Sequence, residues 1–266
     1  NVFKKYNINA LFVFDGIPPQ EKWNTIETRN KEKDQAENMY LELTKKLSES
    51  QYNEEERNKI MLQMNTVRKQ CIRIKKKHFT FAKQLMDALG VKYIDAVGEA
   101  DEICAKFCKS NIAYGCLSDD MDMFTYGCSN ILRNLNLLKE EVTIYNYESI
   151  VYDLQLTPKI FTILLIISTN DYKEDNDNDF NKSLKWYNEY KVSNNIDIIS
   201  FKKWLIENGH LDNIDIINQM ERIYTLNDNI DVNVNNLNVS SSQLYNNVKY
   251  LEIKELLKPY GFIFLN

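Results

Sequence analysis

The pattern of apolar and polar positions changes sharply along the chain. Residues 9–14 (NALFVF) form a short apolar run that predicts a buried strand, and Asp15-Gly16 and two prolines end it. Residues 21–89 are highly charged and contain no Pro or Gly, which predicts long helices with a break near residues 48–53. Two interpretations remain open, a solvated helical hairpin and a helical arch standing off the core.

After Gly90 the pattern alternates between strands and helices. The predicted strands are residues 91–95, 112–117, 130–134 and 141–146, and the predicted helices are residues 99–110, 147–155 and 158–167. This alternation predicts an α/β fold with a mostly parallel central sheet covered by helices on both faces.

The sequence after residue 172 has a different composition. An acidic stretch at 171–179 precedes helices predicted at 181–190 and 199–208. Residues 226–242 are rich in Asn and Ser and predict a loop or linker. A last helix at 249–258 leads into a strand-like GFIFL.

We therefore divide the chain into two parts. Residues 1–172 form a core that includes the charged helical insertion at about 21–89, and residues 173–266 form a mainly helical C-terminal region.

Composition narrows the candidate chemistry. The chain has two histidines, and neither lies in a recognisable nucleophile motif, so catalysis by a His base is disfavoured. Its five cysteines are not spaced like a disulfide framework, so we expect them to be small buried thiols. Cys104 and Cys108 are four residues apart, but no second pair or nearby His in the sequence completes a zinc site. The longest apolar run, residues 161–167, is too short to cross a bilayer, and no signal segment opens the chain, so we expect an intracellular protein.

Charge is segregated despite a net value of −5, since residues 68–83 are strongly basic and residues 171–179 strongly acidic. A local basic run is what contact with phosphates requires, although charged helix faces are usually just solvated.

Acidic residues recur just past the ends of predicted strands: Asp15, Glu99, Asp101, Asp120 and Asp122. In an open α/β sheet the crevice at the carboxyl ends of the strands binds ligands, and clustered carboxylates favour Mg²⁺. Residues two apart on one helix face nearly opposite sides, so Glu99 and Asp101 can share a site only if Glu99 lies in the turn before the helix and Asp101 in its first turn. The same condition holds for Asp120 and Asp122. Simple capping of helix N-termini is the alternative interpretation.

Four segments resemble the flap-endonuclease/XPG family of structure-specific 5′ nucleases in order and spacing. They are residues 12–20 (FVFDGIPPQ), 89–105 (LGVKYIDAVGEADEICA), 118–127 (SDDMDMFTYG) and 164–172 (LLIISTNDY). The resemblance covers residues 8–175 and implies a PIN-like 5′-nuclease fold in which the insertion is the helical arch.

The resemblance also implies roles for individual residues. The metal-site carboxylates are Asp15, Glu99, Asp101, Asp120, Asp122 and Asp171, with Asp101 in place of the family's usual Glu. They would hold two Mg²⁺ ions, for which Mn²⁺ is expected to substitute. Lys22 and Arg29, seven residues apart, match the basic pair that contacts the scissile phosphate, and Arg73, Lys76 and Lys83 are candidate DNA contacts.

The sequence departs from the family pattern in two places. The family's first strand carries a further metal-site Asp that no segment here supplies, so we expect a preceding segment in the full polypeptide. The glycine hairpin that follows Asp-Tyr in the family is replaced by an acidic, Gly-free stretch, which predicts an altered grip on duplex DNA. These departures suggest a divergent branch of the family, such as one in a large DNA virus or an AT-rich eukaryote.

The expected activity is Mg²⁺-dependent hydrolysis of DNA at 5′ flaps, nicks, gaps or free 5′ ends, leaving a 5′-phosphate and a 3′-hydroxyl. This activity serves replication, recombination or repair, in the nucleus or, for a viral protein, in the host cytoplasm. Neither a membrane segment nor a sliding-clamp motif is visible in the sequence. The alternatives are a PIN-like or 5′→3′ exoribonuclease acting on RNA, and a non-catalytic DNA-binding scaffold of the same fold.

Overall fold

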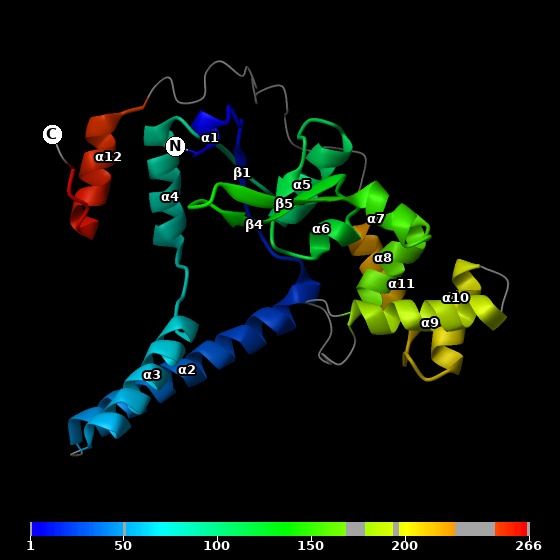
Figure 1. The fold of residues 1–266 in the computed structure, drawn as a ribbon, viewed down its shortest axis with the longest axis horizontal. Coiled ribbons are helices and arrows are strands. Elements are labelled where there is room, and N and C mark those ends of the chain that lie inside the picture. The colour runs from blue at the N-terminus through cyan, green and yellow to red at the C-terminus, as the bar shows by residue number, and fades with distance from the viewer. Residues whose placement is uncertain (1, 50–51, 169–178, 194–196, 227–247, 265–266) are drawn as a thin grey trace. The chain divides into compact units, whose positions relative to one another are not determined.

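The computed structural model describes residues 2–49, 52–168, 179–193, 197–226 and 248–264 (Figure 1). The chain divides into two compact units. The first, Asn1–Pro18 with Tyr93–Leu244, is called the sheet unit here, and the second, Pro19–Lys92 with Tyr245–Asn266, the helical unit. The boundary predicted at residue 172 lies within 169–178, outside the described residues, and stays a prediction.

The strands form two small sheets. They are β1 (Leu11–Phe14), β2 (Lys92–Asp95), β3 (Cys116–Leu117), β4 (Asn130–Asn136) and β5 (Glu141–Asn146). β1 pairs with β2, and the other sheet has the order β3-β4-β5. β3 and β4 are parallel, with Cys116 opposite Ile131, and β4 and β5 are antiparallel, with Ile131 opposite Tyr145.

The α/β class is confirmed, but pairing among the described strands is more mixed than the mostly parallel sheet we predicted. The reason is the connection between β4 and β5. Only residues 137–140 join these strands, and Glu140 takes a positive φ of 57°. A link this short can form only an antiparallel hairpin, because a parallel pair needs a crossover of a dozen or more residues.

The helices of the sheet unit pack partly on the strands and partly on one another. They are α1 (Val2–Lys5), α5 (Ala100–Lys109), α6 (Asp122–Thr125), α7 (Tyr147–Asp153), α8 (Pro158–Ile167), α9 (Phe180–Ser193), α10 (Ile198–Glu207) and α11 (Ile214–Tyr224). α5 and α7 contact the three-stranded sheet, while α9 and α11 pack on α8. The predicted helices near α5, α7, α8, α9 and α10 are therefore confirmed. α11 was not predicted.

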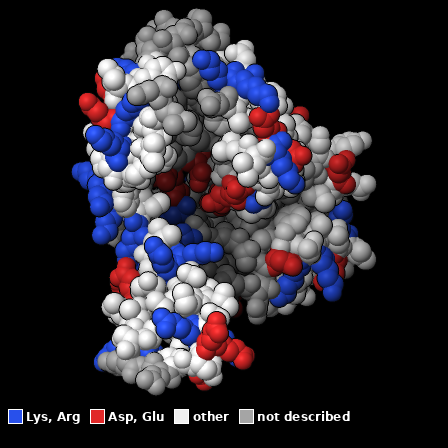
Figure 2. Space-filling view, turned by 60° about the vertical axis from the view of Figure 1, so that its left-hand side comes forward, with Lys and Arg blue, Asp and Glu red and all other residues white. Residues whose placement is uncertain are grey.

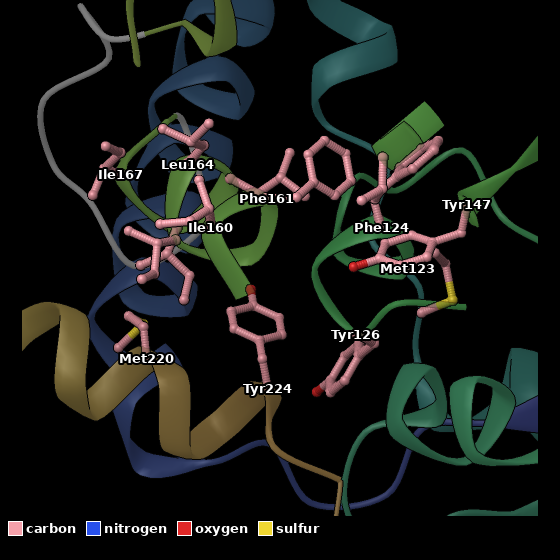
Figure 3. Close-up of a cluster of buried hydrophobic side chains, with 14 of the residues drawn as sticks. Met123, Phe124, Tyr126, Tyr147, Ile160, Phe161, Leu164, Ile167, Met220 and Tyr224 are labelled. Atoms are coloured by element: carbon pink, nitrogen blue, oxygen red, sulfur yellow. The ribbon is translucent and has the colours of Figure 1, made fainter. Parts of the chain in front are cut away.

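The core of the sheet unit is built on α8, in which seven of the ten residues are buried and apolar. Ile163, Leu164 and Ile167 have no exposed surface. Figure 3 shows Leu164 and Ile167 among side chains from α6, α7 and α11. Thr157 caps the helix and a proline occupies its first turn, so the sequence fixes its start.

The α7–α8 segment is also the most apolar part of the described chain. No single described helix is long and apolar enough to cross a membrane. α7 and α8 reach that composition only together, and they meet at 90°.

The helical unit consists of a long antiparallel pair and a smaller pair. Its elements are η1 (Gln20–Lys22), α2 (Trp23–Glu49), α3 (Glu54–Gln70), α4 (Lys76–Leu89), α12 (Tyr250–Leu257) and η3 (Lys258–Tyr260). In Figure 1, α2 and α3 lie side by side. α12 packs against α4, where the rings of Phe81 and Tyr260 lie 4.8 Å apart.

The predicted helix break near 48–53 is confirmed. Asn53 caps α3, because its side chain accepts a hydrogen bond from the Glu56 amide while the Glu56 carboxylate accepts one from the Asn53 amide. A second break, between Gln70 and Lys76, was not predicted. The prediction of a strand-like end is wrong for the part of it that the structure describes, since residues 261–264 form no strand.

The α2–α3 pair is held by few apolar contacts. Ala36, Leu43 and Val67 are its buried residues, and the Arg73 guanidinium bridges Asp34 at 2.7 Å and Glu37 at 2.9 Å. Figure 2 shows acidic and basic side chains interspersed over the outer end of the pair. The pair is thus a largely solvated hairpin, the first of the two interpretations left open above; a role as an arch stays a prediction.

Leu43→Ala should open this pair locally without unfolding the sheet unit. Leu43 is 6% exposed in a core of three buried residues, so its truncation should cost about 2–3 kcal/mol of local stability. Hydrogen exchange should speed up in α2 and α3 and stay unchanged in α8. Leu41→Ala, at an exposed position on the same helix, is the control, and equal exchange in both variants would contradict the expectation.

Candidate metal centre

Three carboxylates of the sheet unit converge in space. Asp101, Asp120 and Asp122 each place one oxygen within 4.8 Å of the others. Asp122 is buried, Asp101 is half-buried and Asp120 is exposed. Three negative groups this close repel one another, and a cation relieves the repulsion. The donor set is purely carboxylate oxygen, which suits Mg²⁺ or Mn²⁺ and disfavours softer metals.

The loop after β3 sets the position of two of these carboxylates. The Ser118 amide donates to the Leu132 carbonyl oxygen at 3.0 Å, which extends the pairing with β4 by one residue. Ser118 Oγ accepts from the Asp120 amide, and Asp120 Oδ1 accepts from the Asp122 amide at 3.0 Å. These two hydrogen bonds hold Asp120 beside the first residue of α6, Asp122.

Arg133 on β4 holds the same loop through hydrogen bonds. Its guanidinium donates to the Asp119 carbonyl oxygen and to Met121 Sδ, and it lies 5.9 Å from the Phe124 ring centre. The Asp119 carboxylate accepts from the Asn134 amide at 2.8 Å. The loop is thus tied to β4 through both backbone and side chains.

Tyr224 is a residue at this site that the sequence analysis missed. Its hydroxyl donates to Asp122 Oδ1 at 2.9 Å across 102 residues of sequence. The signal for its helix was present, since Asn213 caps α11 and Ile217, Met220 and Tyr224 follow at helical spacing. Nothing in the sequence pairs Tyr224 with Asp122.

Asp15 and Glu99 lie at the start of α5, outside the group of three carboxylates. Glu99 is the N-cap residue with extended backbone, and Asp101 lies in the first turn, which is the arrangement that the spacing required. Asp15 Oδ1 accepts from the Ala100 amide at 2.8 Å and so caps the helix. Asp15 thus caps α5 from outside the helix, a role that the sequence did not indicate, and the metal roles of Asp15 and Glu99 stay predictions.

The glycine at position 16 is explained by a close backbone contact in this region. A Cβ on Gly16 would lie 2.2 Å from the Ala96 carbonyl oxygen and 2.3 Å from that of Val97. The Gly16 amide donates to the Gly98 carbonyl oxygen at 2.7 Å. Only glycine allows the turn after β1 to approach the loop before α5 this closely.

The predicted basic residues belong to the helical unit. Lys22 ends the 3-10 turn η1 rather than sharing one α-helix with Arg29, which is exposed on α2. Hydrogen bonding to Glu37 raises the pKa of Arg73, whose charge serves the α2–α3 pair. Lys76 begins α4 and Lys83 lies within it. All five DNA contacts stay predictions, and Asp171 lies outside the described residues.

The cysteines of the sheet unit are buried or half-buried free thiols, as predicted. Hydrogen bonding to Cys128 and burial raise the pKa of Cys108, and hydrogen bonding to Cys104 and burial raise that of Cys116. The fold thus pairs cysteines that the sequence separates. Among the described residues, however, it is the three carboxylates that form a group able to hold a metal ion.

The chain is similar in sequence to known proteins. Residues 90–171 match the XPG I-region. Flap endonuclease 1 of Drosophila grimshawi is 32% identical over 170 residues, which span 63% of this chain and 41% of that protein. Flap endonuclease 1 of Encephalitozoon cuniculi is 30% identical over 168 residues, 62% of this chain and 45% of that protein. The match thus spans less than half the length of these curated relatives.

Solved structures show the same fold. Flap endonuclease-1 from Methanococcus jannaschii aligns over 97% of this chain and 74% of its own, with a TM-score of 0.60 and 21% identity. The catalytic core of Rad2 in complex with DNA substrate aligns over 97% and 75%, with a TM-score of 0.57 and 18% identity.

The chain therefore has the fold of these solved structures, and its carboxylate group lies within that fold. The chain thus contains an XPG I-region and is similar to flap endonuclease 1 over somewhat more than three fifths of its length.

Proposed function

We propose that the protein is a Mg²⁺-dependent, structure-specific 5′ nuclease that hydrolyses DNA phosphodiesters at 5′ flaps, nicks, gaps or free 5′ ends. The observation that carries the proposal is the convergence of Asp101, Asp120 and Asp122 within 4.8 Å, in a chain whose residues 90–171 match the XPG I-region. DNA as the partner is supported by the Rad2 core, a structural neighbour solved with DNA substrate. The proposed role is in replication, recombination or repair inside the cell.

The three carboxylates would hold the metal, with Asp15, Glu99 and Asp171 as further candidates. Two divalent ions, which can be Mn²⁺ as well as Mg²⁺, would polarise the scissile phosphate and lower the pKa of the attacking water. Asp122 supplies a fixed, buried ligand at the start of α6, and Asp101 and Asp120 complete the group from neighbouring elements. The chain's own contribution is thus a preorganised anionic site for cations at the phosphate.

Lys22 and Arg29 are proposed to contact the scissile phosphate. A lysine and an arginine stabilise negative charge that grows on phosphate oxygens in the transition state. Arg73, Lys76 and Lys83 would then follow the DNA backbone as general phosphate contacts. Arg73 can do so only by sharing its guanidinium with Asp34 and Glu37.

The test is cleavage of a 5′-labelled flap duplex in Mg²⁺ by the native protein and by Asp120→Ala/Asp122→Ala. We expect the native protein to cut near the junction and the double variant to bind the flap without cutting. Glu148→Ala/Asp153→Ala removes two exposed carboxylates of α7 and should cut like the native protein.

Matched substrates separate the alternatives. Faster cleavage of an RNA flap than of the DNA flap would indicate an exoribonuclease of the same fold. Equal DNA binding by native protein and double variant, with no cleavage by either, would indicate a scaffold and would contradict the catalytic assignment of the carboxylates.

A further inference from the structure

Asp122 is the most buried of the three clustered carboxylates, and it has a neutral donor from a distant helix. Asp122 is 7% exposed and Tyr224, at the end of α11, is 5% exposed. The Tyr224 hydroxyl lies 2.9 Å from Asp122 Oδ1. A buried carboxylate needs hydrogen bonds to offset the loss of water, and a tyrosine supplies one without adding charge.

Tyr224 is held in place by the packing of its own helix. Its ring meets that of Tyr126 edge-on, with centroids 4.9 Å apart, and Figure 3 shows it at the side of the core cluster that faces Tyr126. α11 packs on α8, and the Lys202 ammonium of α10 binds Glu221 and Asn218 one turn or more before Tyr224. A hydroxyl anchored this way has little freedom to follow a rotating carboxylate.

The hydrogen bond therefore constrains the carboxylate rather than the reverse. The terminal torsion of an aspartate is soft, so hydrogen bonds to its oxygens help to decide the direction of the carboxylate. The hydrogen bond from Tyr224 to Oδ1 therefore restricts the directions that the second oxygen, Oδ2, can take. Donors of this kind orient ligands at metal sites, and their loss typically weakens metal binding by about 10–100-fold.

We propose that Tyr224 is a positioning residue that orients Asp122 for metal binding, and that α11 thereby couples the C-terminal half of the sheet unit to the carboxylate site. The proposal rests on the proposed function, in that it takes Asp122 to be a metal ligand. It adds a residue from outside the XPG I-region, 53 positions beyond its last matched residue, 171.

The competing explanation is that Tyr224 only stabilises the fold. Tyr190 provides a matched control, because it is also buried in the sheet unit and its hydroxyl also donates at 2.9 Å, to the Asp197 carbonyl oxygen. Tyr190→Phe and Tyr224→Phe remove the same atom and a donated hydrogen bond of the same length, and Tyr190→Phe also removes the hydrogen bond that its hydroxyl accepts from the Asp197 amide at 3.3 Å. The control is therefore at least as disruptive to the fold as the test variant. They differ in whether a carboxylate of the site loses its donor.

The experiment is titration of the protein with Mn²⁺, followed by the electron paramagnetic resonance signal of the free ion. The variants are Tyr224→Phe, Tyr190→Phe and Asp122→Asn. We expect Tyr224→Phe to bind Mn²⁺ about tenfold more weakly than wild type and Tyr190→Phe to bind within twofold of it. Asp122→Asn should show the largest loss. Thermal unfolding without metal should confirm that both Phe variants are folded.

Cleavage of the flap duplex at increasing Mg²⁺ provides a second readout. For Tyr224→Phe the metal concentration for half-maximal rate should rise with the Mn²⁺ dissociation constant, whereas a purely structural loss would leave that concentration unchanged. Mn²⁺ affinity of Tyr224→Phe within twofold of wild type would overturn the proposal.

The two hypotheses fail in different ways. A wild-type protein that binds Mn²⁺ but does not cut DNA contradicts the proposed function, while a selective loss of affinity in Tyr224→Phe still supports the positioning role. A wild-type protein that binds no Mn²⁺ contradicts both.

Discussion

Asp101→Asn should make the metal-free protein more stable and at the same time abolish cleavage. Asp101 stands within 4.8 Å of two other carboxylates, so its charge raises the energy of the folded state whenever no cation is present. Removing that charge should raise the free energy of unfolding by about 1–2 kcal/mol, as neutralising an unfavourable charge commonly does. The same change removes a metal ligand and should slow cleavage by about a thousandfold or more.

The measurement is thermal unfolding with Mg²⁺ and with EDTA, together with cleavage of the flap duplex. In wild type, Mg²⁺ should raise the melting temperature and EDTA should reverse the rise, because a ligand of the folded state stabilises it. In Asp101→Asn the melting temperature should be higher than that of wild type in EDTA and should respond weakly to Mg²⁺.

Glu102→Gln, at the next position of α5, is the matched control with the opposite sign. Glu102 binds Lys106 at 2.7 Å, and the Lys106 side chain is only 10% exposed. Neutralising Glu102 should therefore lower the melting temperature and leave cleavage intact. An Asp101→Asn protein that is destabilised in EDTA would contradict the view that the three carboxylates repel one another.

Lys22→Met/Arg29→Met should reduce cleavage by about a hundredfold or more while Mn²⁺ binding stays unchanged. The proposed role of both cations is to stabilise charge on the scissile phosphate, so their loss should act on the rate at saturating DNA. Methionine keeps much of the apolar stem of either side chain and removes the charge.

The control for this double variant is Lys31→Met, on the same helix. Lys31 is exposed and pairs with Glu27 one turn earlier, an exposed ion pair that contributes little. It should leave the cleavage rate within about twofold of wild type. If Lys31→Met and the double variant lose activity equally, the helical unit acts through its general charge. The assignment of Lys22 and Arg29 as specific phosphate contacts would then be wrong.

The sequence was most informative where the chain carries local signals. The spacing of Glu99 and Asp101 required one residue before the helix and one in its first turn, and the structure has that arrangement. Asn53 and Thr157 mark helix starts through capping, which depends on neighbours three residues away. Such features are predictable because the interacting atoms are close in sequence.

Features that depend on distant contacts could not be predicted in this way. Residues 71–75 (CIRIK) contain no helix breaker, yet the helix ends there and Arg73 reaches back to Asp34 and Glu37 of α2. The apolar GFIFL pattern suits a strand but has no strand beside it among the described residues, so no ladder forms. Tyr224 looks like any apolar position of an amphipathic helix until the fold brings it to Asp122.

The close approach at Gly16 has a consequence for how sequence change can reach the site. The turn after β1 and the loop before α5 leave no clearance for even a methyl group, since the Ala96 carbonyl oxygen would lie 2.2 Å from it. Asp15 on one side of this contact caps the helix whose first turn carries Asp101. A single added carbon at position 16 would thus push apart the turn after β1 and the loop before α5. The N-terminal end of α5 would then shift, and with it the carboxylate of Asp101.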